Sequence, residues 1–166
     1  MANNEVDKVT SETIHAGGLL AKVYFDMQSE KIDDLQPLMT DLISNKLLKM
    51  PGVVYCLGEI AEPIKVENHY STNAEAMILV KDVAALINIC FHYTPLGIEI
   101  IKPEKEIVLK IPQLQSILLD LATVSTQYSE YILSRVLTKE DYEKVQSDLK
   151  NRELLGKKLL EKKEGE

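Results

Sequence analysis

Apolar and polar side chains alternate along residues 20–27, and this period of two, with β-branched and aromatic members, predicts a half-buried β-strand. Residues 53–60 are largely apolar in both alternating sets, which is typical of a strand in the centre of a sheet. Two shorter apolar runs, residues 74–80 and residues 98–101, predict two more strands. The polar segment at residues 62–70 is predicted to connect the second strand to the third.

Two segments between these strands have apolar residues at helical spacing. The first follows the first strand and is stopped at Met50-Pro51-Gly52. The second follows Asp82, whose carboxylate is suited to cap a helix, and residues 94–97 end it. The order strand, helix, strand, strand, helix, strand is that of a ferredoxin-like fold. We therefore expect an α+β domain over residues 18–110, with a βαββαβ antiparallel sheet and both helices on one face.

The segments on either side of this domain are not predicted to belong to the sheet. Residues 1–17 are mostly polar and end in Gly17-Gly18, and they are predicted to be a flexible lead-in. Residues 111–166 are predicted to form a C-terminal helical arm, because Pro112 stands where proline favours a first helical turn. Within the arm, Thr138 to Asp141 resembles a capping box, which predicts that a second helix begins there.

The apolar stripe on the first helix of this arm predicts an oligomer interface. Its candidate interface residues are Leu114, Leu118, Leu121, Tyr128 and Ile132. The stripe either covers the free face of the sheet within one chain or pairs with a second subunit. A helix over residues 111–136 is about 39 Å long at standard rise, more than a sheet of short strands needs. Part of the stripe should overhang, so we expect a homo-oligomer.

Composition and charge narrow the class of protein. The 166-residue chain is long enough for one domain with its own core, and its formal net charge is −7. No cluster of Lys or Arg stands clear of acidic neighbours, so neither nucleic acid nor a membrane surface is expected as a partner. The chain has no apolar run of membrane-spanning length and no signal-peptide pattern near its start. Cys56 and Cys90 are too few for a disulfide framework, which predicts reduced thiols and a cytoplasmic location.

The order of elements over residues 20–101, about half of the chain, resembles that of an ACT or ACT-like regulatory domain. The likeness is closest at Met50-Pro51-Gly52-Val53, because a helix in that superfamily ends at a proline-glycine turn just before the second strand. The resemblance implies a small effector, such as an amino acid, held between paired domains by the loop after the first strand. It therefore implies Gln28 and Ser29 as candidate ligand-binding residues.

Titratable side chains are densest between Glu59 and His69, a segment that also contains Glu62 and Glu67. One interpretation is a general acid/base pair or a weak divalent-ion site. The other is a solvated hairpin tip, which we favour because surface turns are usually polar. Glu59 and His69 are accordingly candidate ligand-binding residues.

No other constellation in the sequence predicts catalysis. The three histidines never occur at a metal-ligand spacing, and there is no glycine-rich phosphate loop, so we expect no metal and no cofactor. The sequence thus favours a non-enzymatic small-molecule-binding or regulatory protein that acts as a homo-oligomer. The alternatives are a small enzyme with acid/base residues near Glu59 and His69, or a scaffold subunit of a larger complex.

Overall fold

The computed structural model describes the backbone of residues 2–163 and the side chains of residues 5–151, 154 and 155. The chain divides into two compact units, and the division falls between Val108 and Leu109. The boundary predicted from the sequence falls two residues later, after residue 110, and residues 1–17 are predicted to be a separate lead-in.

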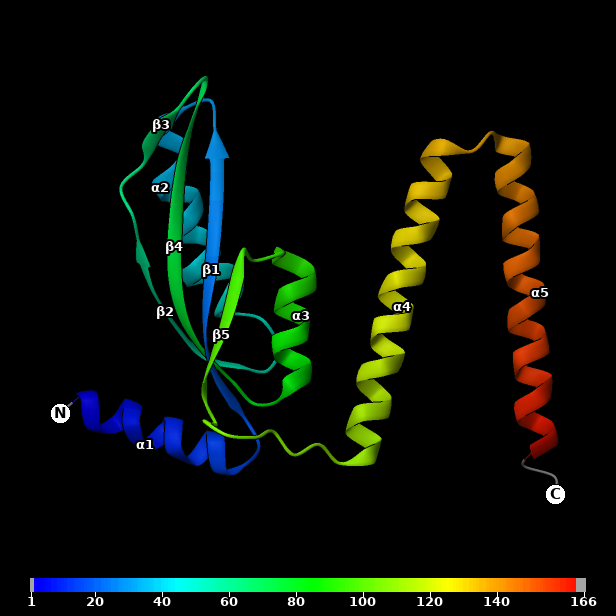
Figure 1. Ribbon diagram of the computed structural model, residues 1–166, viewed down its shortest axis with the longest axis horizontal. Coiled ribbons are helices and arrows are strands. Elements are labelled where there is room, and N and C mark those ends of the chain that lie inside the picture. The colour runs from blue at the N-terminus through cyan, green and yellow to red at the C-terminus, as the bar shows by residue number, and fades with distance from the viewer. Residues whose placement is uncertain (1, 164–166) are drawn as a thin grey trace. The chain divides into compact units, whose positions relative to one another are not determined.

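The first unit is built on a five-stranded antiparallel sheet (Figure 1). Its strands are β1 (Leu19–Ser29), β2 (Val53–Ile60), β3 (Ile64–Val66), β4 (His69–Val80) and β5 (Gly97–Lys102). The strand order is β2-β4-β1-β5, and β3 pairs with the outer part of β4. The α+β class and the four expected strands are confirmed. The sequence did not predict β3, a three-residue strand inside the polar connection.

Helices α2 (Ile32–Asp41) and α3 (Val83–Tyr93) pack on one face of this sheet, and in Figure 1 the strands lie in front of α2. Alternate residues of β1 point toward them, and Ala21, Val23 and Phe25 are buried in the core cluster. Asp82 caps α3 as predicted, since its carboxylate accepts a hydrogen bond of 2.8 Å from the Ala85 amide. The chain after α2 continues as a π-helical segment, η1 (Leu42–Leu47), where the sequence suggested one regular helix.

Residues 2–15 correct the expectation of a flexible lead-in, because they form a helix, α1 (Ala2–His15). Thr10 is only 7% exposed, and its hydroxyl lies 3.0 Å from the hydroxyl of Tyr55 on β2. Tyr55 is opposite Leu79, on the face that points away from α2 and α3. Helix α1 therefore covers one end of the second face of the sheet. The segment has few apolar residues, so its periodic signal is weak.

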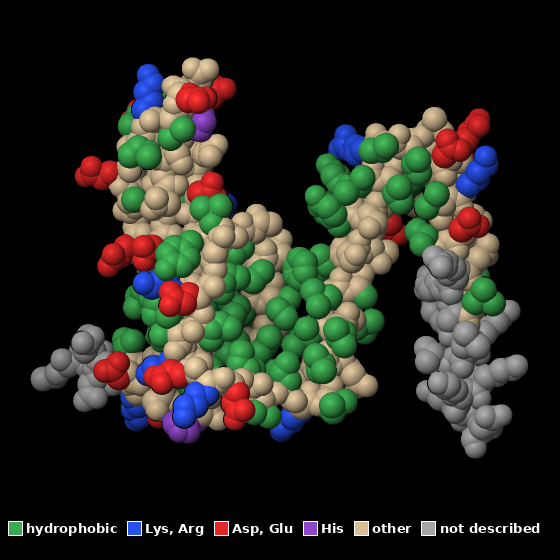
Figure 2. Space-filling model, viewed as in Figure 1, with side chains coloured by type: hydrophobic (Ala, Val, Ile, Leu, Met, Phe, Trp, Pro, Cys, Tyr) green, Lys and Arg blue, Asp and Glu red, His purple; other side chains and the backbone are tan. Residues whose placement is uncertain are grey.

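The second unit consists of α4 (Ile111–Val136) and α5 (Lys139–Lys163), which run antiparallel and are joined by Leu137 and Thr138 (Figure 1). Apolar side chains lie at the surface at intervals along α4 (Figure 2). Within the described part of the chain, no helix combines the length and the apolar character that a bilayer span requires.

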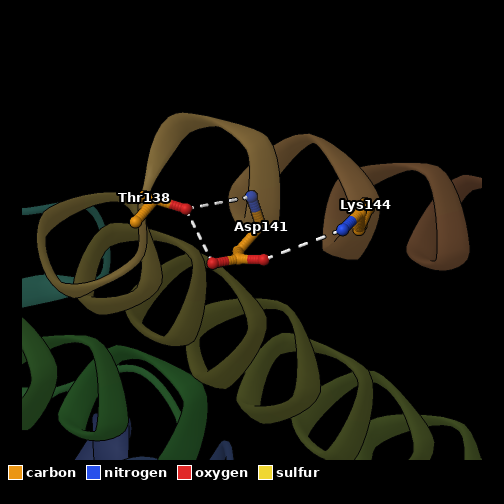
Figure 3. Close-up of polar contacts among 3 residues, drawn as sticks. All are labelled: Thr138, Asp141 and Lys144. Carbon is orange, nitrogen blue, oxygen red and sulfur yellow. Dashed lines mark hydrogen bonds and ion pairs between the residues drawn. The ribbon is translucent and has the colours of Figure 1, made fainter.

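Thr138 caps α5, and the predicted helix start is confirmed. Its hydroxyl accepts a hydrogen bond of 3.3 Å from the Asp141 amide and donates one of 2.6 Å to the Asp141 carboxylate (Figure 3). The same carboxylate lies 3.9 Å from the ammonium of Lys144. A hydroxyl and a carboxylate at the first turn satisfy free amides and favour the positive end of the helix dipole.

Candidate functional site

Among the described residues of the first unit, α1 covers one end of the sheet face opposite α2 and α3, and no other element of that unit covers the rest. We call the uncovered part the open face. Strand alternation assigns Lys22, Tyr24 and Asp26 of β1 to it, because their neighbours Val23 and Phe25 point into the core. Charged side chains of both signs lie over the strands in Figure 2. The open face is thus a polar surface on a rigid scaffold.

Lys22 lies in the middle of the open face among carboxylates from three other strands. It is directly opposite Glu99 of β5, and its ammonium lies 3.4 Å from a carboxylate oxygen of Glu75 on β4. Glu75 in turn is directly opposite Glu59 of β2. The pKa of Lys22 is raised, first by the charge of the Tyr24 phenol and then by the hydrogen bond and charge of Glu75. The Lys22 ammonium is therefore paired with the Glu75 carboxylate, while Glu99 lies opposite it and Glu59 lies beyond Glu75 on the next strand.

A shallow concavity of about 380 Å³ lies beside this group of charges. Its lining residues are Lys22, Leu57, Gly58, Glu59, Glu75 and Met77. Leu57 is 57% exposed although it is a large apolar side chain in the middle of a strand. Small-molecule sites combine apolar walls with a few placed polar groups, and this concavity has both.

The structure separates the four ligand-binding residues that the sequence suggested. Gln28 lies on the open face, whereas Ser29 points to the opposite face and its hydroxyl accepts from the Lys31 amide at 3.1 Å. His69 begins β4 and pairs with Val66, and it is a diagonal neighbour of Gln28. Gln28 and His69 are therefore close together at the end of the β1–β4 pair, Ser29 lies on the other face of that end, and Glu59 lies further along the sheet.

Glu59 is opposite Glu75, and His69 is six residues from Glu75 along β4. At about 3.3 Å per residue, roughly 20 Å separate the two ends of the predicted pair. Glu62 and Glu67 are both exposed. The titratable residues of this segment are thus spread along a strand and a hairpin, not gathered around one point.

Sequence reasoning missed most of the open-face group, namely Lys22, Tyr24, Leu57, Glu75, Met77 and Glu99. Alternation places Lys22 on the polar side of its strand. It does not say which strands flank that strand, and the flanking strands supply the carboxylates. Only the strand order of a ferredoxin-like sheet, if it had been used, could have indicated that these residues lie together.

The predicted interface residues of α4 recur at spacings of three and four along one side of the helix. With Ile111 and Ser125 they form a continuous row, which we call the α4 seam: Ile111, Leu114, Leu118, Leu121, Ser125, Tyr128 and Ile132. Leu118 is 56% exposed and Tyr128 is 67% exposed with α5 in place. Exposed apolar rows of this length are typical of interaction surfaces.

The described residues contain no group of three His, Cys, Asp or Glu side chains that could hold a metal ion. Cys56 is buried and Cys90 is half-buried, and both are free thiols. Burial raises the pKa of the Cys56 thiol to about 11. A buried thiol with a raised pKa is a poor nucleophile.

The protein is therefore of the α+β class. Its first unit is an antiparallel sheet with α2 and α3 on one face and α1 on part of the other, and its second unit is a helical hairpin. Residues 20–148 match the sequence model of the MJ0538 family, and the chain belongs to that family. No curated protein and no solved structure matches the chain. The matched stretch begins in β1 and ends in α5, so it takes in all of α4 and leaves out α1.

Proposed function

We propose that this protein is a non-enzymatic binding or regulatory protein that holds a small molecule on the open face and acts as a homo-oligomer. We propose further that its first unit is a ferredoxin-like domain of ACT-like type. The strand order β2-β4-β1-β5, with α2 and α3 on one face, supports this topology. The observation that carries the function is the concavity beside Lys22, Glu59 and Glu75.

The chemistry of the concavity favours a small ligand with a positive group. Its volume of about 380 Å³ lies at the lower end of the range for ligand sites. Glu59 and Glu75 face each other with like charge, and an ammonium group between them would reduce their repulsion. Leu57 supplies exposed apolar contact area. Amino acids and aliphatic amines combine these features and are the first compounds to test.

The geometry gives less support to the enzyme alternative. A general base must lie within about 3 Å of the proton that it removes, or reach it through one water. Glu59 and His69 are separated by roughly 20 Å along the sheet, so they cannot act on one small substrate as an acid/base pair.

Thermal unfolding of the full chain with a panel of amino acids, aliphatic amines and nucleotides tests the ligand part. A ligand that binds only the folded state must raise the unfolding temperature. We expect stabilisation by at least one cationic compound, lost in Glu59→Gln and kept in Glu62→Gln. Glu62 is the matched control, an exposed carboxylate outside the concavity. A panel without any stabilising compound, or an equal loss in both variants, contradicts the proposal.

Sedimentation equilibrium at micromolar concentration tests the homo-oligomer. We expect an association that involves α4, because the α4 seam exposes large apolar side chains to water. A monomer across the whole concentration range contradicts this part and leaves the ligand part untouched.

A further inference from the structure

The uncharged character of α4 extends well beyond the α4 seam. Its charged residues are Asp120, Glu130 and Arg135, in a helix of 26 residues. When the seam is read as the a and d positions of a heptad, the flanking e and g positions between Ile111 and Ser134 carry no charge. Asp120 and Glu130 fall on the outward side. Depletion of charge over a wide strip is the mark of the buried core of a protein interface.

Helix α5 does not provide the missing cover. It follows α4 in an antiparallel hairpin, yet Leu118, Tyr128 and Ile132 are 56%, 67% and 43% exposed. Its own sequence from Lys139 onward is dominated by charged residues, as in a helix that faces water. Two helices alone cannot bury such a seam, and helical stability in water depends on burial of the apolar face.

The α4 seam is complementary to itself when two copies run antiparallel about a two-fold axis. One such register places the two-fold axis next to Thr123. Leu121 then faces Ser125 of the second copy, and Leu118 faces Tyr128 of the second copy. In these central layers a large side chain meets a smaller or more slender one, which is how interdigitated layers fill space. The same register sets Leu114 against Ile132, and Ile111 against Arg135 at the two ends. The two-fold axis repeats every contact, as an isologous interface requires.

A parallel pair in register is less favourable. It would set Ser125 against Ser125, leaving a void, and Tyr128 against Tyr128, leaving a crowded layer. Arg135, the next heptad position after Ile132, would meet its own copy with like charge. The antiparallel arrangement separates all three self-contacts and opposes the helix dipoles.

We infer that the partner of the α4 seam is the α4 seam of a second copy of this chain, paired antiparallel, with Leu121 of each copy against Ser125 of the other. This inference rests on the proposed homo-oligomer and specifies its interface. The result is a bundle of four helices, in which the two α4 helices form the centre and the charged α5 helices lie outside. The family match supports an integral role for α4, because it includes the whole helix.

Cross-linking of two single-cysteine proteins tests the register. Leu121→Cys and Ser125→Cys are made separately in the full chain, with Cys90→Ala and Cys56→Ala removing the native thiols. Each protein is oxidised alone and after mixing, and dimers are counted on a non-reducing gel. Antiparallel pairing gives a disulfide only in the mixture, because each new thiol faces the other substituted position. A dimer from Ser125→Cys alone indicates parallel pairing and overturns the inference.

A charge placed in the seam tests the interface independently of the cysteines. Leu118→Glu should convert the oligomer to monomer, whereas Gln127→Glu, on the outward side of the same helix, should leave it intact. Helix content by circular dichroism shows whether each variant is folded. If the wild type associates and Leu118→Glu associates equally, the seam is not the interface and the inference fails while the homo-oligomer stands. If the wild type is monomeric, the proposed homo-oligomer fails as well.

Discussion

Glu59 and Glu75 lie directly opposite each other on β2 and β4, and both carboxylates are exposed on the open face. Like charges in directly opposed positions destabilise a sheet. The ammonium of Lys22 lies 3.4 Å from Glu75, and within the described residues no ion pair involves Glu59. The sheet therefore carries an electrostatic cost at the place where its surface is hollowed and where Leu57 is exposed.

Glu59→Gln should increase stability, because it removes the repulsion and keeps the size and polarity of the side chain. The expected gain is about 0.5 kcal/mol in the free energy of unfolding at neutral pH and low salt. Urea unfolding measures it, and added salt should shrink the difference by screening. Glu62→Gln, outside the opposed pair, should leave the urea midpoint unchanged. A lower midpoint for Glu59→Gln would show that the carboxylate stabilises the fold.

Leu47→Ala should destabilise the first unit strongly, because Leu47 is fully buried at the end of η1. Removal of a buried leucine side chain costs about 2–5 kcal/mol, depending on how far the cavity collapses. The next residue is a matched control, since Leu48 is 43% exposed and Leu48→Ala should change stability by no more than about 0.5 kcal/mol. Urea unfolding of both variants compares them. Equal losses would mean that η1 is not packed as described.

Four of the five strands of the first unit could be predicted because each has alternation or a continuous apolar run. The helix start at Thr138 and the cap at Asp82 could be predicted because a short polar side chain directly before an apolar helical pattern is favoured as an N-cap. Helix α1 could not, because its contact with the sheet depends on Thr10 and Tyr55, whose proximity is a tertiary property. Local patterns therefore identified the elements that bury a wide apolar face and missed those held by a few specific contacts.

The candidate site was less predictable than the fold. Gln28 and His69 do come close, but Glu59 belongs to a different part of the sheet, because the long β1–β4 pair extends well beyond β2. Lys22 and its carboxylates meet only after strands distant in sequence have paired. The spacing of residues along the chain does not predict which side chains of distant strands become neighbours.

Tyr55→Phe should loosen α1 without unfolding the sheet. It deletes the hydroxyl that lies 3.0 Å from the Thr10 hydroxyl, in the contact between α1 and β2. A lost hydrogen bond of this kind costs about 1 kcal/mol, which corresponds to an approximately fivefold drop in hydrogen-exchange protection of the α1 amides. Tyr24→Phe, further along the open face, is the control and should leave α1 protection unchanged. If α1 amides exchange at the unprotected rate in the wild type, the helix is not docked in solution.

The thiol of Cys56 should resist alkylation in the native protein in a way that depends on pH. Burial raises its pKa to about 11, and burial also raises the pKa of the half-buried Cys90. At pH 8 a thiol with a pKa of about 11 is roughly one part in a thousand thiolate, whereas an unperturbed cysteine is roughly one quarter thiolate. Iodoacetamide should therefore label Cys90 before Cys56, as mass spectrometry of the peptides would show.

The pH dependence separates the raised pKa from simple shielding. Between pH 8 and pH 9 the native labelling rate of Cys56 should rise about tenfold, because its thiolate fraction rises tenfold while it remains far below its pKa. In guanidinium chloride both cysteines should react at one rate, which rises by less than tenfold over the same interval. A native rate for Cys56 that equals the denatured rate, or that exceeds the rate for Cys90, would contradict its place in the core between the sheet and its helices.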